Sequence, residues 1–206
     1  MKIISPTLFL LAAATLALTS RAAPVTVKLD TSFLSGGNYY LDFQLTDGSG
    51  TGDGSNTAVV SAFDFGGGSA FGAVTSYGTV TGDLSSSVSL TDTDPFTEFY
   101  QAFSAGSFLM FQLELTNHYS GGTPDLFGFS ILDGSLFNLA TYAPASDQFL
   151  TVNLDGAALA YSTYPSVDGI AAPTVSAVPD TLNTAWAGLL GLVALALIRQ
   201  RKNCAV

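Results

Sequence analysis

A glycine-rich stretch of the 206-residue chain carries residue types that bind divalent cations. It runs from Asp47 to Asn56 and reads DGSGTGDGSN. Carboxylate and amide oxygens on a flexible loop are the ligands that calcium prefers. The stretch does not match the helix–loop–helix calcium loop, because Ala58 stands where that loop needs a bidentate Glu. Two interpretations stay open: a solvated hairpin connection, or a calcium site in which Asp47, Asp53 or Asn56 join acids from elsewhere.

Few other residues could support catalysis. His118 is the only histidine and Cys204 the only cysteine, which argues against a zinc site and excludes an intrachain disulfide. His118 follows a predicted strand, which favours a polar turn residue over a general base. A carboxylate pair needs neither residue type, but the two glutamates, Glu98 and Glu114, are not brought together by the sequence. We predict no catalytic residues and no enzyme activity, and calcium is the only cofactor considered.

The charge of the chain is concentrated in its acidic centre. Fifteen of the 16 Asp and Glu residues lie between Ala23 and Val178, where Lys28 is the only basic residue. Because neutralising phosphates takes Lys and Arg, this composition argues against nucleic-acid binding. The residues between the two apolar ends are enough for one domain with a single core. We place this domain at residues 23–177.

The N-terminus has the order of a secretory signal peptide. Lys2 precedes an apolar stretch from Leu8 to Leu18, and small residues follow it. Cleavage after Ala22 puts Ser20 and Ala22 at the two positions that need small side chains. Residues 1–22 are therefore predicted to be a signal helix that directs export, with signal peptidase as a partner. A retained membrane anchor is the alternative.

A second apolar run lies near the C-terminus. As a helix, residues 182–198 would rise about 25 Å, slightly less than a hydrocarbon core of about 30 Å. Arg199, Arg201 and Lys202 follow directly, and such charges are held on the cytoplasmic side of a membrane. We predict a transmembrane helix over 182–198 with the acidic domain outside the cell. A buried core helix is the alternative.

The motif in front of this run carries a resemblance. Val178-Pro179-Asp180, an apolar helix and a basic end follow one another over residues 178–206. This tail resembles the PEP-CTERM class of bacterial sorting signals, in particular its VPDSG-CTERM variant, although Thr181-Leu182 replaces the Ser-Gly of that variant. The resemblance implies recognition by an exosortase, a membrane transpeptidase that cuts near the motif. The protein would then pass from the inner membrane to the cell surface or extracellular matrix.

Between the two ends the pattern is that of β-strands. Leu41, Phe43 and Leu45 alternate with polar residues, and this period of two is typical of a strand with one buried face. Similar segments are expected at residues 25–29, 58–65, 74–80, 87–90, 109–115, 127–132, 149–154 and 157–162. Short strands between Gly-, Ser-, Asn- and Asp-rich turns predict an all-β fold with a single antiparallel β-sandwich or jelly-roll domain. A closed barrel is the alternative.

One segment is predicted to be a short helix. Asp94 can cap a helix that begins at Pro95, with Glu98 near its positive end. The phenylalanines of the segment would face the core at three- and four-residue spacing. We expect one or two turns from Pro95 to about Ala102 that close the edge of the sandwich.

The order of the central segments also resembles a known group of proteins. SLTDTDPFTEFYQAF, FLMFQLELT and GGTPDLFGFSILD follow one another, as in an uncharacterised family of exported bacterial PEP-CTERM proteins. That resemblance covers most of residues 25–165 and supplies no catalytic residue. We expect an exported envelope or matrix protein without enzyme activity. The alternative is a calcium-dependent carbohydrate-binding module that contacts extracellular polysaccharide through tyrosines, because the only Trp is Trp186 in the apolar tail.

Overall fold

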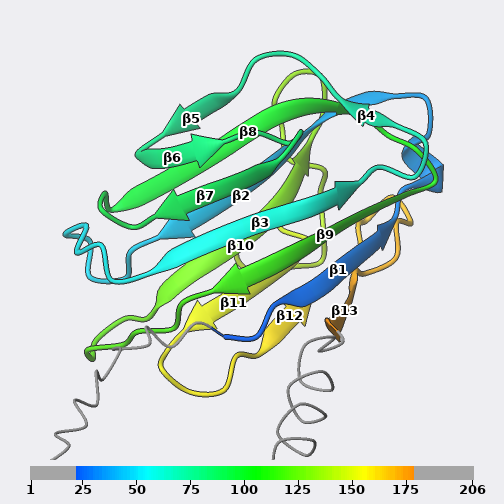
Figure 1. The fold of residues 1–206 in the computed structure, drawn as a ribbon. Coiled ribbons are helices and arrows are strands. Elements are labelled where there is room, and N and C mark those ends of the chain that lie inside the picture. Colours follow the sequence, from blue (N-terminus) through cyan, green and yellow to red (C-terminus); the bar gives the residue numbers. More distant parts are fainter. Residues whose placement is uncertain (1–21, 179–206) are drawn as a thin grey trace, which may run out of the picture.

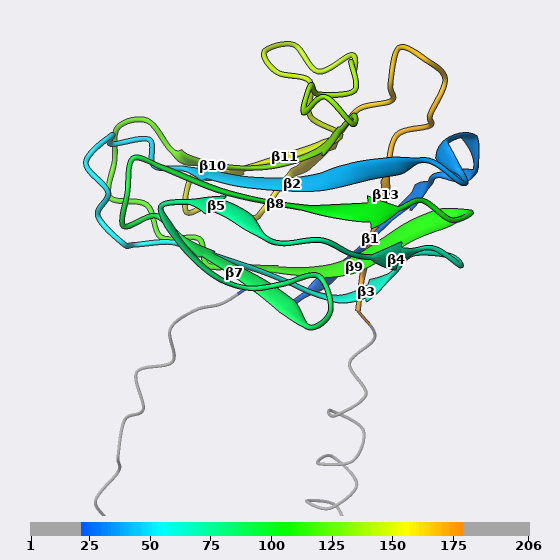
Figure 2. The same cartoon turned by 90° about the horizontal axis from the view of Figure 1, so that it is seen from above.

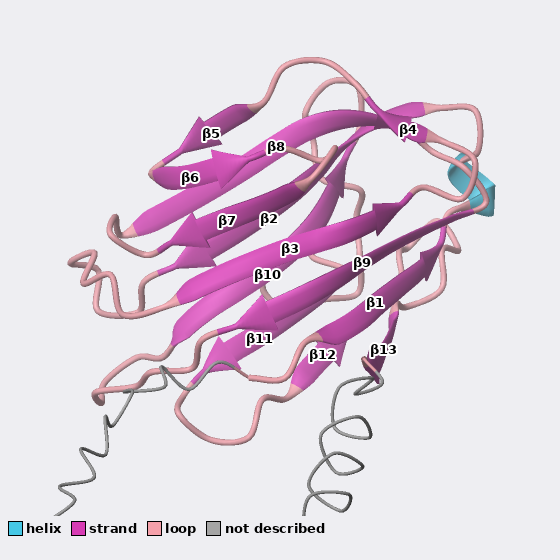
Figure 3. Cartoon of the chain, in the orientation of Figure 1, coloured by secondary structure: helices cyan, strands magenta, loops and turns pink. Residues whose placement is uncertain are grey.

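The computed structural model describes residues 22–178, which form two antiparallel β-sheets and one short 3-10 helix, Ser32–Leu34 (Figure 3). Sheet I contains β1 (Val25–Asp30), β3 (Thr57–Asp64), β6 (Thr79–Gly82), β7 (Ser87–Thr91), β9 (Phe108–Leu115) and β13 (Thr174–Ala177). Sheet II contains β2 (Asn38–Thr46), β4 (Ser69–Ala70), β5 (Thr75–Tyr77), β8 (Phe96–Ser104), β10 (Asp125–Leu132), β11 (Leu150–Leu154) and β12 (Tyr161–Thr163).

The two sheets pack face to face (Figures 1 and 2). Sheet I has the strand order β13-β1-β9-β3-β7-β6, and sheet II has the order β12-β11-β10-β2-β8-β4, with β5 also paired to β8. The all-β class and the antiparallel sandwich are confirmed.

Phenylalanine rings from both sheets fill the space between them. The ring centroid of Phe43 on β2 lies 5.4 Å from that of Phe111 on β9 and 5.5 Å from that of Phe129 on β10. All three residues are at most 1% exposed. Because side chains alternate along a strand, burying these rings turns their polar neighbours to the outer face of each sheet. The outer face of sheet II carries the site described below.

The helix predicted from Pro95 to Ala102 is wrong. Phe96–Ser104 is the strand β8, which pairs with β2 along its whole length, from Asn38↔Ser104 to Thr46↔Phe96. Its sequence FTEFYQAFS is rich in aromatic residues, which pack well on a pleated surface. Pairing with a neighbouring strand therefore outweighs the local capping signal. Asp94 accepts a hydrogen bond from the Thr79 hydroxyl instead of capping a helix.

The single strand predicted over 74–80 is divided between the two sheets. β5 pairs with β8 in sheet II, whereas β6 pairs with β7 in sheet I. Gly78 lies between them with φ +72°, and a Cβ there would lie 2.7 Å from Thr97 Oγ1. The chain therefore crosses from one sheet to the other at a position that suits glycine. The sequence patterns also did not predict β4 and β13, and β12 begins at Tyr161 rather than at residue 157.

The first and last strands of the domain pair with each other. Val25 of β1 lies opposite Ala177 of β13, and the Val178 N–H donates to the Pro24 carbonyl (3.2 Å). The domain thus begins and ends at one edge of sheet I (Figure 1). Within residues 22–178, no helix is long and apolar enough to cross a membrane. Several predicted features lie outside the described residues: most of the signal peptide, Pro179, Asp180, the helix over 182–198, Arg199, Arg201 and Lys202.

Candidate functional site

Two carboxyl groups meet on the outer face of sheet II. The Gln44 side-chain amide donates to Asp42 Oδ2 (2.8 Å) and to Glu98 Oε1 (3.1 Å). Asp42 and Gln44 are two residues apart on β2 and therefore share a face. Gln44 lies opposite Glu98 of β8 in the strand register. The pairing of β2 with β8 thus places the two acids on either side of one amide nitrogen.

The β10–β11 connection covers these groups and forms a cavity of about 230 Å³, which we call the outer cleft. The connection stands out from sheet II in Figure 2. Asp133 shapes its first turn, because Asp133 Oδ1 accepts hydrogen bonds from the N–H groups of Ser135 (2.8 Å) and Phe137 (3.0 Å). The cleft is lined by Asp42, Gln44, Glu98, Tyr100, Leu132, Leu136 and Asn138.

Asp42 is a buried acid at the floor of the outer cleft. Its side chain is 1% exposed, and burial raises the pKa of Asp42 to about 8, with a further contribution from the Glu98 charge. The hydrogen bond from Gln44 acts in the opposite direction. Asp42 is therefore protonated at neutral pH and lies beside a second carboxyl group. Such a pair can exchange a proton or bind hydroxyl groups.

Two buried oxygens next to the cleft, Asp42 Oδ1 and Ser130 Oγ, lack a hydrogen-bond partner among the described residues. Asp42 and Ser130 lie opposite each other on β2 and β10. Both oxygens are shielded from solvent, and Ser130 is not among the residues that line the cleft. The surface open to a ligand is therefore the polar lining that includes Glu98, Tyr100 and Asn138.

Family models, curated proteins and solved structures give no match to this chain. Its function is therefore inferred from its own residues.

The predicted calcium loop lies against two acids from elsewhere in the chain. The Asn56 side-chain amide donates to Asp125 Oδ2 (2.6 Å), and the Asn56 backbone N–H donates to both oxygens of Asp92 (3.0 and 3.1 Å). Asp92 is fully buried. Burial raises the pKa of Asp92 to about 7, together with the neighbouring Asp125 carboxyl group and the charge of Asp53.

The oxygens predicted as calcium ligands are largely used within the protein. Asp47 Oδ2 accepts hydrogen bonds from the N–H groups of Thr51 (2.9 Å) and Gly52 (2.6 Å). Asn56 Oδ1 accepts from the His118 N–H (2.8 Å) and the Thr116 hydroxyl (3.1 Å). Across residues 22–178, no group of three or more acidic, His or Cys side chains is placed to hold a metal ion. Calcium binding at Asp47, Asp53 or Asn56 stays a prediction.

Other residues considered for chemistry are spread over the domain. His118 uses its backbone to hold Asn56, since its carbonyl also accepts from the Asn56 amide (2.8 Å). Glu98 lies on sheet II and Glu114 on sheet I, so they do not form a pair. Among the tyrosines, Tyr142 is 67% exposed, whereas Tyr119 beside the acidic loop is 42% exposed. No pair of exposed tyrosines is seen above that loop within the described part of the chain.

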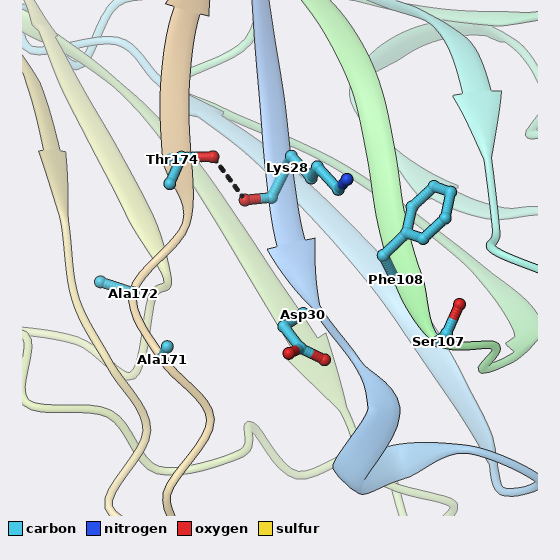
Figure 4. A pocket seen from close by; sticks show the side chains of 7 residues that line it. All are labelled: Lys28, Asp30, Ser107, Phe108, Ala171, Ala172 and Thr174. Carbon is cyan, nitrogen blue, oxygen red and sulfur yellow. Dashed lines mark hydrogen bonds between the residues drawn. The ribbon is translucent and has the colours of Figure 1, made fainter.

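A groove of about 350 Å³ at the edge of sheet I contains Lys28, the one basic residue of the described domain (Figure 4). The Lys28 ammonium lies 4.5 Å from the centre of the Phe108 ring. The Thr174 hydroxyl donates to the Lys28 carbonyl (3.3 Å) and so ties β13 to β1. The Asp30 carboxylate also lines this groove and interacts with the Lys28 charge, which offsets the positive charge that a ligand would meet. We therefore regard this groove as a weaker candidate for ligand binding than the outer cleft.

Sequence reasoning missed the outer cleft for two reasons. The alternation on β2 places Asp42 and Gln44 on one face, but that face was expected to be wet, and the loop that covers it was not recognised. Glu98 was assigned to a helix, which gave its side chain the wrong neighbours. A strand over this segment places Glu98 and Tyr100 on one face, because side chains alternate. The sequence FTEFYQAFS does not show this, since aromatic residues fall on both faces.

Proposed function

We propose that this protein is an exported, non-enzymatic component of the bacterial cell surface or extracellular matrix, sorted through its C-terminal tail by an exosortase-type enzyme. The observation that carries the proposal is the position of the folded domain between the two predicted processing points. β1 begins at Val25, shortly after Ala22, and β13 ends at Ala177, directly before Val178. Removal of both ends would leave the two-sheet domain whole.

The charge of the domain supports a place outside the cell. It carries fifteen acids, and its single lysine lies over an aromatic ring. A strongly negative domain is soluble and avoids anionic surfaces. The positive charges of the chain lie almost entirely in the two end segments, where they would direct membrane insertion and then be lost.

Intact-mass analysis of the protein from its native host tests the proposal. We expect a mature N-terminus at Ala23 and a C-terminus near Asp180. A double variant, Pro179→Ala with Asp180→Ala, should keep the full tail and stay in the membrane fraction. The variant Asp168→Asn, which lies upstream of the motif on an exposed loop, serves as the control. A mature wild-type chain that still ends at Val206 would contradict sorting.

A carbohydrate-binding module is the second candidate. The observation that favours it is the outer cleft with its mostly polar lining, rather than the acidic loop on which the calcium-dependent form of this candidate is based.

A further inference from the structure

The polar side chains that line the outer cleft suit a ligand that brings hydroxyl groups. Both N–H groups of the Gln44 amide are already used on Asp42 and Glu98. Asp42 and Ser130 are each 1% exposed, and each keeps a buried oxygen without a partner. Both oxygens are shielded from solvent, so a ligand in the cleft would meet Glu98, Tyr100 and Asn138 instead. A hydroxyl group both donates and accepts, so it can pair with a carboxyl, a carboxylate or another hydroxyl.

The charge around the cleft selects against an anionic ligand. Glu98 supplies the negative charge of the lining, since Asp42 is protonated, and no basic side chain is among the lining residues. Lys28 lies on β1 of sheet I, in the other layer of the sandwich. A sulfated or carboxylated ligand would therefore meet uncompensated negative charge. A neutral ligand avoids this repulsion.

The size and ligand set of the cleft do not favour a metal ion. Its volume of about 230 Å³ is several times the roughly 30 Å³ that one water occupies in the liquid. Only two carboxyl groups line it, whereas calcium takes about six to eight oxygen ligands. No metal-holding group of acids is found in residues 22–178. The cleft has room for a ring-sized organic ligand.

The remaining walls offer apolar contacts. Tyr100 packs edge-on against Tyr40, with ring centres 6.1 Å apart at 79°. Leu136, in the covering turn, is 46% exposed, and the adjacent Phe137 is 71% exposed. A sugar ring presents hydroxyl groups at its edge and C–H groups on its faces. Polar groups on the floor and apolar groups at the rim match both of these features.

We propose that the outer cleft binds one neutral hexose unit of a glycan, with Glu98, Asn138 and Tyr100 contacting its hydroxyl groups and Leu136 contacting its apolar face. Asp42 is a positioning residue, because its carboxyl group is buried and holds the Gln44 amide from below. This activity goes beyond export and sorting, which need no ligand.

Isothermal titration calorimetry on the full chain tests the proposal. The protein is purified in a detergent without a sugar headgroup and titrated with cellohexaose, laminarihexaose and mannohexaose. An alginate hexamer and calcium chloride are titrated as charged probes. We expect saturable binding of at least one neutral hexaose and no binding of the alginate hexamer.

Two variants place the binding in the outer cleft. Glu98→Gln and Asn138→Ala should each weaken binding about tenfold, as expected for the loss of one ligand hydrogen bond. Glu114→Gln, the same change on sheet I, is the matched control and should bind like the wild type. Far-ultraviolet circular dichroism checks folding. If Glu98→Gln does not fold, Asn138→Ala on the covering loop decides alone.

Three results would overturn the proposal. The first is no saturable binding of any of the three neutral hexaoses. The second is binding that Asn138→Ala leaves at wild-type strength. The third is binding of the alginate hexamer that is tighter than binding of the neutral hexaoses. Binding of calcium alone that Glu98→Gln weakens to the same extent would count equally. Because these measurements use the unprocessed chain, a negative result leaves the sorting proposal intact, and a failure of sorting leaves glycan binding intact.

Discussion

At the scale of single residues, buried acids set the response of the domain to pH. The pKa of Asp42 is raised to about 8 and that of Asp92 to about 7, in each case mainly by burial. Both values lie above those of the unfolded chain, so the folded state holds protons that the unfolded state releases. Their contribution to stability is complete below about pH 4. It is lost progressively as the pH rises from there through about 7 to 8.

The variant Asp42→Asn should therefore flatten this pH dependence. The wild type should melt at lower temperature at pH 8 than at pH 5. Keeping Asp42 protonated in the folded state lowers the free energy of unfolding by at most about 1.4 kcal/mol for each pH unit. The amide cannot ionise, so the variant should gain most relative to the wild type at pH 8. Thermal melts followed by circular dichroism at several pH values measure this. Asp168→Asn, which removes an exposed acid, should keep the wild-type slope, and equal slopes in all three proteins would contradict the assignment.

Asn56 illustrates a buried polar residue whose role is structural. It is 0% exposed and joins the acidic loop to Asp92, Asp125 and the chain around His118. Asn56→Ala would leave Asp125 Oδ2 and the His118 N–H without this partner. We expect a loss of about 2 to 4 kcal/mol, measured as a lower melting temperature. Asn153→Ala, at an exposed position on β11, should change it little. A similar melting temperature for both variants would show that the Asn56 hydrogen bonds do not hold the loop.

At the scale of elements, the decisive features are the places where a strand changes partner. Gly78 separates β5 from β6 with positive φ, close to Thr97. Gly67 also has a positive φ, +98°, but a Cβ there would meet nothing within 4 Å. A comparison of alanine variants at the two glycines therefore separates the cost of backbone strain from the cost of a steric clash.

Gly78→Ala should destabilise the domain more than Gly67→Ala. Backbone strain alone costs about 1 to 3 kcal/mol, and both variants carry it. Only Gly78→Ala adds a contact that forces β5, β6 or Thr97 to move, so we expect it to lose at least about 1 kcal/mol more. Chemical denaturation of the two variants gives the difference. Equal losses would show that the crossing between sheets adapts to a side chain.

The sequence predicts those parts of the fold whose signals are local, and not those that depend on pairing between distant segments. Strands such as β2, β9 and β10 were predicted, because alternation of Leu and Phe with polar residues is local. The strand β8 was not, because its capping signal is local whereas its pairing with β2 is not. The outer cleft depends on that pairing and on a loop that begins 29 residues after the end of β8, so neither Asp42 nor Glu98 could be assigned to it from sequence patterns.

At the scale of the whole molecule, the excess of acids shapes stability. Lys28 is the only basic residue among residues 22–178, against fifteen acids. Repulsion among exposed like charges opposes the compact state. Salt screens this repulsion, with a Debye length of about 10 Å at 0.1 M ionic strength. The domain should therefore become more stable as salt is added.

A comparison of sodium chloride with calcium chloride at equal ionic strength separates screening from specific binding. Asp47 and Asn56 already use their oxygens in hydrogen bonds, so we expect both salts to raise the melting temperature of the full chain by the same amount. Specific binding would add a further rise, because a ligand that binds only the folded state stabilises it. An extra rise in calcium that is lost in Asp53→Asn, but kept in the control Asp168→Asn, would contradict this expectation. It would establish a calcium site at the acidic loop, where Asp53 and Asp92 lie close enough for their charges to interact.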